Sequence, residues 1–140
     1  MPKKTGADKM LKVDHIGYAV KNIEKARETF EEIGFRFEEL FHDTARNVDI
    51  VFGEKDGYRI ELIAPLDRSM ESPVDGVLGK NGPTAYHLCY AAEDLEAEME
   101  KLKTLRFRPV TEPAPAVAFG GRRVVFLMNL AIGLMEIVEE

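Results

Sequence analysis

The chain has 140 residues, of which 45% are hydrophobic and 31% are charged, and its formal net charge is −6. This length and balance predict one soluble globular domain with a sizeable core. An acidic chain without a concentrated basic face argues against nucleic acid as a partner, and no apolar run approaches the roughly 20 residues of a membrane-spanning helix. The single cysteine, Cys89, allows no intrachain disulfide and fits a cytoplasmic location.

The first half of the chain predicts a strand, a helix and three further strands. Residues 1–10 are polar and predict a disordered tail. Residues 11–20 (LKVDHIGYAV) predict a strand, and residues 21–35 predict an amphipathic helix that stops at Gly34. The segment GEKDG (53–57) predicts a hairpin turn. The three further strands are predicted at residues 35–41, 47–52 and 58–64.

The second half repeats the same order of elements after a linker over residues 65–83, which holds a short helix near VDGVLGK. A strand is predicted at 84–91 and a helix at 93–105, and the Pro- and Gly-containing segment 111–121 predicts a loop. Three more strands are predicted at 107–110, 122–128 and 134–139. We therefore expect two βαβββ modules, at about 11–64 and 84–140, within a single domain over 11–140.

The two halves align residue by residue. A shift of 72 residues superposes His15 on His87, and a shift of 75 superposes Glu61 on Glu136. The two shifts differ by three residues, which are extra residues of the second half and are expected to lie in loops. Each module therefore carries one histidine on its first strand and one glutamate on its last strand.

These four side chains have mostly small or apolar neighbours on the same strand faces. An ionised carboxylate in such surroundings needs a partner, because desolvation alone costs several kcal/mol. Two imidazoles and two carboxylates carry a charge of about −2, which balances one divalent ion. Taken singly, each histidine and each glutamate is more often structural, but their matched register favours a metal site built from His15, Glu61, His87 and Glu136.

The chain resembles the vicinal oxygen chelate superfamily, which includes glyoxalase I, methylmalonyl-CoA epimerase, extradiol dioxygenases and bleomycin-resistance proteins. The motifs that carry the resemblance are DHIGYAV, RIELIAPL, SPVDGVLGKNG, YHLCYAAEDLEA and GLMEIVE, and within the superfamily they are most similar to the epimerase group. The resemblance implies an α+β fold in which the two modules form a metal-lined cup, and commonly a homodimer. It implies the same four metal ligands, holding one Ni, Co, Zn or Mn ion.

The resemblance also implies chemistry through a stabilised enolate, with Glu136 as a ligand that also acts as a base. Some epimerases carry a base on the third strand, and Asp49 in NVDIV lies near that place. We weigh Asp49 equally as a second base and as an outward-facing strand residue. The chain departs from the epimerase pattern at Tyr86, where those enzymes carry a second histidine, and at FLMN (126–129), where they carry FLHP.

The leading hypothesis is a methylmalonyl-CoA epimerase-like isomerase or lyase whose substrate is a small thioester. A glyoxalase I-like lactoylglutathione lyase, which acts on a hemithioacetal, is an alternative. A second class is a non-catalytic ligand-binding protein of the bleomycin-resistance type, which the four intact ligands disfavour. An iron dioxygenase is a third possibility, but it normally uses two histidines and one carboxylate.

Overall fold

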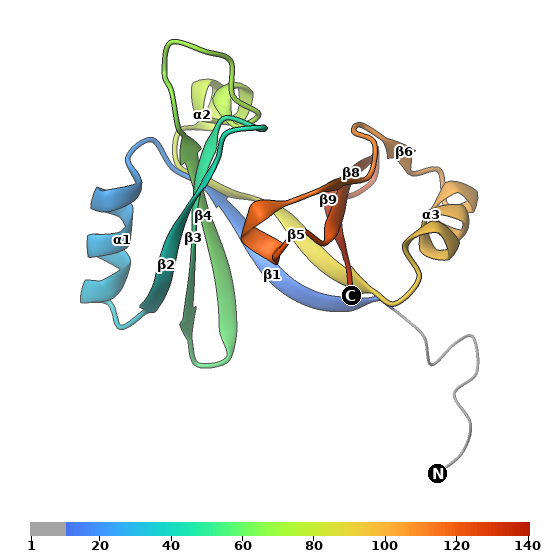
Figure 1. Cartoon of the computed structure of the whole chain (residues 1–140), viewed down its shortest axis with the longest axis horizontal. Coiled ribbons are helices and arrows are strands. Elements are labelled where there is room, and N and C mark those ends of the chain that lie inside the picture. Colours follow the sequence, from blue (N-terminus) through green and yellow to red (C-terminus); the bar gives the residue numbers. More distant parts are fainter. Residues whose placement is uncertain (1–10) are drawn as a thin grey trace. The chain divides into compact units, whose positions relative to one another are not determined.

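A computed structural model describes residues 11–140, so the predicted tail over 1–10 lies outside the described residues. The chain divides into two compact units (Figure 1). The N-terminal unit is His15–His87, and the C-terminal unit consists of residues 11–14 together with Leu88–Glu140. The linker predicted over 65–83 belongs to the N-terminal unit.

The N-terminal unit is a four-stranded sheet with a helix on one face. The strand order is β2-β3-β4-β1, in which β4 runs parallel to β1 and antiparallel to β3. β1 begins among the residues of the C-terminal unit and continues into this one. The elements are β1 (Lys12–Ala19), α1 (Ile23–Glu32), β2 (Arg36–Asp43), β3 (Val48–Lys55), β4 (Tyr58–Pro65) and α2 (Asp75–Asn81).

The turn between β3 and β4 is shorter than the sequence predicts. Lys55 pairs with Tyr58, so only Asp56 and Gly57 form the turn, and both have positive φ (54° and 83°). This is the pattern of a two-residue hairpin with a primed turn, which Asp-Gly favours. The prediction of a turn over 53–57 was therefore wrong at its first three positions, which extend β3.

Helix α1 covers one face of this sheet (Figure 1). The helix starts at Asn22, whose side chain accepts a hydrogen bond from the Lys25 amide at 3.0 Å and so caps the first turn. The apolar face of α1 contributes Ile23, Ala26 and Phe30 to the core of the unit. The strand residues in that core are Val51, Ile60, Leu62 and Ala64. Because strand side chains alternate, the residues between them point to the opposite face.

The C-terminal unit has the same plan, and its first strand, β5, begins among the residues of the N-terminal unit and continues from Leu88 into this one. Its strand order is β5-β9-β8-β6, with β7 also paired to β8, and β9 runs parallel to β5. The loop predicted over 111–121 contains the short strand β7 and a 3₁₀ turn, while the strand predicted at 107–110 is only two residues long. The elements are β5 (Thr84–Ala92), α3 (Leu95–Thr104), β6 (Arg108–Pro109), β7 (Ala114–Pro115), η1 (Val117–Phe119), β8 (Arg123–Asn129) and β9 (Gly133–Glu139).

The strand register confirms the internal repeat. Gly17 pairs with Glu61 in one unit, and Cys89 pairs with Glu136 in the other, which are the positions that shifts of 72 and 75 residues superpose. Asp94 caps α3 as Asn22 caps α1. The predicted α+β fold with two βαβββ repeats is therefore confirmed.

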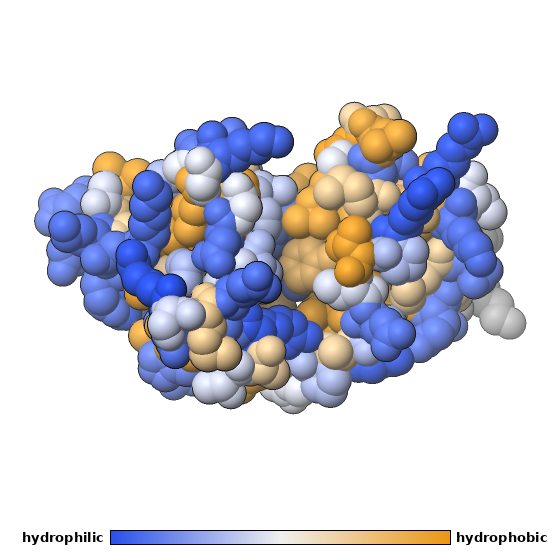
Figure 2. Space-filling view, turned by 90° about the horizontal axis from the view of Figure 1, so that it is seen from above, coloured by the Kyte–Doolittle hydropathy of each residue, from blue (hydrophilic) through white to orange (hydrophobic). Residues whose placement is uncertain are grey.

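The surface agrees with the acidic, charge-rich composition. Hydrophilic side chains cover much of the face shown in Figure 2, with hydrophobic side chains gathered in places between them. Among the described residues, no helix has both the length and the apolar character that crossing a membrane would require.

Candidate metal centre

Three of the four predicted ligands meet in the N-terminal unit. His15 on β1 and His87 on β5 both direct Nε2 towards the same oxygen of Glu61 on β4, at 3.2 Å and 3.7 Å from Oε1. One ligand atom from each of the three lies within 4.8 Å of the others. All three side chains are buried.

Strand pairing explains why these residues converge. Gly17 lies beside Glu61 in the parallel pair of β1 and β4. His15 is two residues before Gly17 and therefore on the same face. A Cβ atom built on Gly17 would lie 2.0 Å from Cε1 of His87, so only a glycine lets the imidazole approach the strand this closely. Gly17 is a functional residue that the motifs do not reveal, although a glycine inside a strand can signal such an approach.

Aromatic contacts fix the two imidazoles. The Phe52 ring is edge-on to His15 with the ring centroids 5.3 Å apart, and the two histidine rings are edge-on to each other at 5.9 Å. The guanidinium of Arg59 lies 4.2 Å above the Phe52 ring. Tyr86, where the epimerase pattern has a histidine, packs edge-on against His87 at 4.5 Å. These contacts restrict the orientations of the two imidazoles and place aromatic rings beside them.

The donor set fits a divalent metal ion. Nitrogen and oxygen ligands about 2.0–2.2 Å from such an ion lie roughly 3.0–3.5 Å from each other in octahedral or tetrahedral geometry. The 3.2 Å contact between His15 and Glu61 falls in this range, and the 3.7 Å contact of His87 is slightly longer. Imidazole with carboxylate suits first-row divalent ions, a class that includes the Ni, Co, Zn and Mn that the resemblance implies.

The fourth predicted ligand, Glu136, lies on β9 in the C-terminal unit and is 4% exposed. It pairs with Cys89 on β5 and with Phe126 on β8, and Leu134 and Val138 share its face of the strand. The neighbours that the strand pairing gives it are therefore apolar. Within its unit it holds the place that Glu61 holds in the other, where Phe52 is the paired aromatic residue.

The structure does not bring Asp49 to the two imidazoles. Asp49 pairs with Ala64, whereas Phe52 pairs with Glu61. Asp49 and Phe52 are three positions apart on β3, so the Asp49 side chain points to the opposite face of the sheet, the face that α1 covers. There its carboxylate forms a hydrogen bond with Nδ1 of His42, the residue directly across on β2.

These features define a class of protein: an α+β chain of two βαβββ repeats, each with a histidine on its first strand and a glutamate on its last, in which imidazole and carboxylate groups meet on the sheet. Residues 14–126 match the family model described as the Glyoxalase/Bleomycin resistance protein/Dioxygenase superfamily. The chain belongs to this superfamily, as its motifs predict.

Two curated relatives are acyl-CoA epimerases. The ethylmalonyl-CoA/methylmalonyl-CoA epimerase of Cereibacter sphaeroides is 30% identical over 122 residues, which are 83% of this chain and 87% of that protein. The mitochondrial methylmalonyl-CoA epimerase of Mus musculus is 28% identical over 121 residues, 85% of this chain. The aligned part spans 66% of the mouse protein, just under two thirds of its length.

A solved structure shares the fold. The methylmalonyl-CoA epimerase of Mycobacterium tuberculosis superposes with a TM-score of 0.78 at 28% identity, over 91% of this chain and 87% of that one. The similarity in sequence and in fold therefore points to the same group of the superfamily.

Proposed function

We propose that this protein is a metal-dependent epimerase of an acyl-CoA thioester, of the methylmalonyl-CoA epimerase kind. The observation that carries the proposal is the convergence of His15 and His87 on one carboxylate oxygen of Glu61. The similarity to acyl-CoA epimerases supports the substrate class. This reading also accounts for two histidines and a glutamate buried together on the face of the sheet opposite α1.

We propose that one Ni, Co, Zn or Mn ion is held by His15, Glu61, His87 and Glu136. The three residues of the N-terminal unit supply a fitting donor set, and the repeat supports Glu136 as the fourth ligand. β5 carries His87 and, two residues later, the Cys89 that pairs with Glu136. An ion held there would supply Lewis acidity towards the substrate carbonyl.

In the proposed reaction the carboxylate of Glu136 removes the proton from the carbon next to the thioester carbonyl. Solvent returns a proton to the opposite face of that carbon and gives the epimer, and Glu136 then releases to solvent the proton that it took, so no atoms are gained or lost. Asp49 remains a second candidate base, but its place on the α1 face favours Glu136.

The predictions of the substrate and of the oligomeric state follow from the resemblance to acyl-CoA epimerases. We propose a small CoA thioester as the substrate, in preference to a glutathione hemithioacetal, because the relatives named above act on acyl-CoA. A homodimer and a cytoplasmic location remain predictions. Sedimentation of the purified protein tests the dimer.

Proton exchange tests the proposed reaction. Metal-loaded protein is incubated with methylmalonyl-CoA in D₂O, and loss of the α-proton signal is followed by NMR. We expect rapid exchange with the wild type and a fall of roughly 100-fold or more with Glu136→Gln, since a general base typically contributes 10²–10⁴-fold. Asp49→Asn is the matched carboxylate control and should exchange like the wild type.

Two results would contradict the proposal. Absence of exchange with fully metal-loaded wild type would exclude the epimerase, and parallel assays with a methylglyoxal–glutathione hemithioacetal would then test the glyoxalase alternative. If exchange is lost in Asp49→Asn but kept in Glu136→Gln, the general base is Asp49, on the α1 face of the sheet, and not Glu136.

A further inference from the structure

A groove of about 730 Å³ lies within the C-terminal unit, between the end of α3, β6 and the turn that joins β8 to β9. Asn129 shapes it, because its side chain donates a hydrogen bond to the Leu105 carbonyl at 3.0 Å and accepts one from the Ala131 amide at 2.8 Å. Its apolar side chains are well exposed. They are Leu105, Val110, Met128 and Leu130.

Two arginines, Arg106 and Arg108, line the same groove. Both are exposed, and neither forms an ion pair with a carboxylate in the described part of the chain. Arg123 on β8 is different, since Glu96 and Glu139 bind its guanidinium. In a chain of net charge −6, two arginines without carboxylate partners beside an apolar groove complement a ligand that is both anionic and partly apolar.

The backbone at Arg106 adds an independent observation. Arg106 follows the end of α3 with φ of 68°, and its counterpart after α1 is Gly34 with φ of 107°. The two positions differ by 72 residues, the shift of the repeat. A left-handed backbone at this place favours glycine and costs free energy for any larger residue. The second repeat nevertheless has an arginine where the first has a glycine. A residue kept in an unfavourable backbone conformation indicates a functional role for its side chain.

Arg108 lies on the same face of its sheet as Glu136. Arg108 pairs with Met128, and Phe126, two residues earlier on β8, pairs with Glu136. Arg108 lies two strands away from Glu136, about 10 Å across the sheet. It is also displaced by two residues, about 7 Å, along the strand direction. A small acyl group at Glu136 does not span this distance, but the extended arm of a thioester does.

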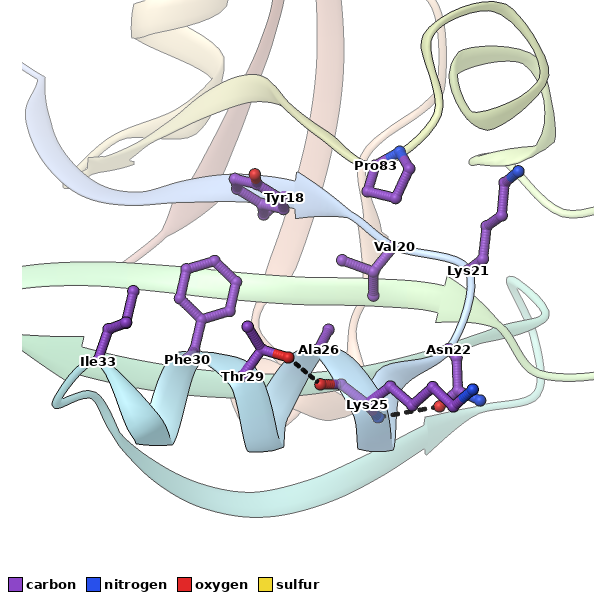
Figure 3. Close-up of a pocket in the computed structure, with 10 residues that line it drawn as sticks. All are labelled: Tyr18, Val20, Lys21, Asn22, Lys25, Ala26, Thr29, Phe30, Ile33 and Pro83. Atoms are coloured by element: carbon purple, nitrogen blue, oxygen red, sulfur yellow. Dashed lines mark hydrogen bonds between the residues drawn. The ribbon is translucent and has the colours of Figure 1, made fainter.

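We propose that this groove binds the phosphate-bearing arm of a CoA thioester, with the pantetheine chain against the apolar side chains and the phosphates on Arg106 and Arg108. The inference rests on the proposed function and adds to it the part of the substrate that the groove recognises. A second groove, of about 480 Å³, lies between α1 and β1 in the N-terminal unit (Figure 3). Its residues Tyr18 and Val20 alternate with His15 along β1, so it opens on the opposite face of that sheet.

Binding of free CoA tests the inference without catalysis. Calorimetry measures the affinity of the metal-loaded full-length chain for CoA and for pantetheine, which lacks the phosphates. We expect Arg106→Gly and Arg108→Gln each to weaken CoA binding about tenfold and to leave pantetheine binding unchanged, because each removes a charge-assisted contact to phosphate. Arg106→Gly matches the backbone of Gly34, so the variant keeps its fold.

Lys25→Gln is the control, since it removes a cation from the groove of Figure 3 and should bind CoA like the wild type. Equal CoA affinity in the wild type and both arginine variants would overturn the inference, as would an equal loss in Lys25→Gln. The outcome is independent of the proton-exchange assay. CoA binding that depends on the arginines supports the groove even if no exchange occurs, and exchange with arginine-independent CoA binding supports the epimerase without the groove.

Discussion

At the scale of single residues, the centre depends on a glycine as much as on its ligands. The imidazole of His87 lies where a Cβ of Gly17 would be, and its Nε2 reaches Glu61 from there. The site therefore needs a small residue at position 17 before any question of metal affinity arises. The equivalent position in the second repeat is Cys89, which is fully buried.

Substitution of this glycine should damage both the fold and the centre. In Gly17→Ala the new methyl group overlaps the His87 ring, and overpacking of this kind costs about 1–3 kcal/mol. We expect a lower free energy of unfolding in urea and weaker metal binding by equilibrium dialysis. Gly76→Ala is the control, since a Cβ at this glycine of α2 would meet no atom within 4 Å, and it should bind metal like the wild type. Unchanged metal affinity in Gly17→Ala would show that the position of His87 is not critical.

At the scale of secondary-structure elements, the length of one turn decides which face Asp49 occupies. A five-residue turn over 53–57, as the sequence suggests, would pair Phe52 with Tyr58 and therefore Asp49 with Glu61. The two-residue turn at Asp56 and Gly57 instead pairs Asp49 with Ala64. A register shift by an odd number of residues moves a side chain to the other face of the sheet, so Asp49 points to α1 and not to the imidazoles.

Residue positions in the repeat can be predicted from the sequence, whereas strand register cannot. The matched positions of His15 and His87, and of Glu61 and Glu136, follow from the repeat and need no exact strand ends. The close approach of His87 to Gly17 depends on the register of the strands, and so does the face of the sheet on which Asp49 lies. This register is known only once the strand pairs are observed. Short elements such as β7 and η1 carry too few residues for a periodic pattern.

Another element-scale feature is the ion pair that joins the ends of β8 and β9. Arg123 donates a hydrogen bond from Nε to Glu139 at 3.1 Å and also contacts Glu96 on α3 at 2.7 Å. The hydrogen bond from Arg123 lowers the pKa of Glu139 below its ordinary value of 4.5, against the opposing effect of burial. A carboxyl group with a lowered pKa in the folded state stabilises the fold above its ordinary pKa, and this contribution is lost as the pH falls through the lowered value.

Acid titration of stability tests this ion pair. Between about pH 6 and about pH 3, the free energy of unfolding of Glu139→Gln should fall less than that of the wild type, because the variant has no carboxylate to protonate there. Glu100→Gln removes an exposed glutamate on α3 and serves as the control. If wild type and Glu139→Gln lose stability in parallel over this range, the ion pair does not contribute to the fold.

At the scale of the whole molecule, two βαβββ repeats place equivalent residues in equivalent registers, and this repetition supports the proposed function. One repeat shows a histidine and a glutamate in contact. The other presents the same pair of residue types, with Glu136 in the place of Glu61. Membership in the Glyoxalase/Bleomycin resistance protein/Dioxygenase superfamily agrees with this reading, and its central claim, the metal centre, can be measured directly.

That measurement is the metal content of the purified protein, with the wild type beside His15→Ala, Glu61→Gln and Glu136→Ala. The account predicts about one divalent ion per chain in the wild type and a loss of affinity of roughly 100-fold or more in each variant, since each removes a direct ligand. Asp49→Asn should retain the ion. A wild type that binds no divalent ion when supplied with one, or a Glu136→Ala variant that binds it as tightly, would contradict the four-residue centre.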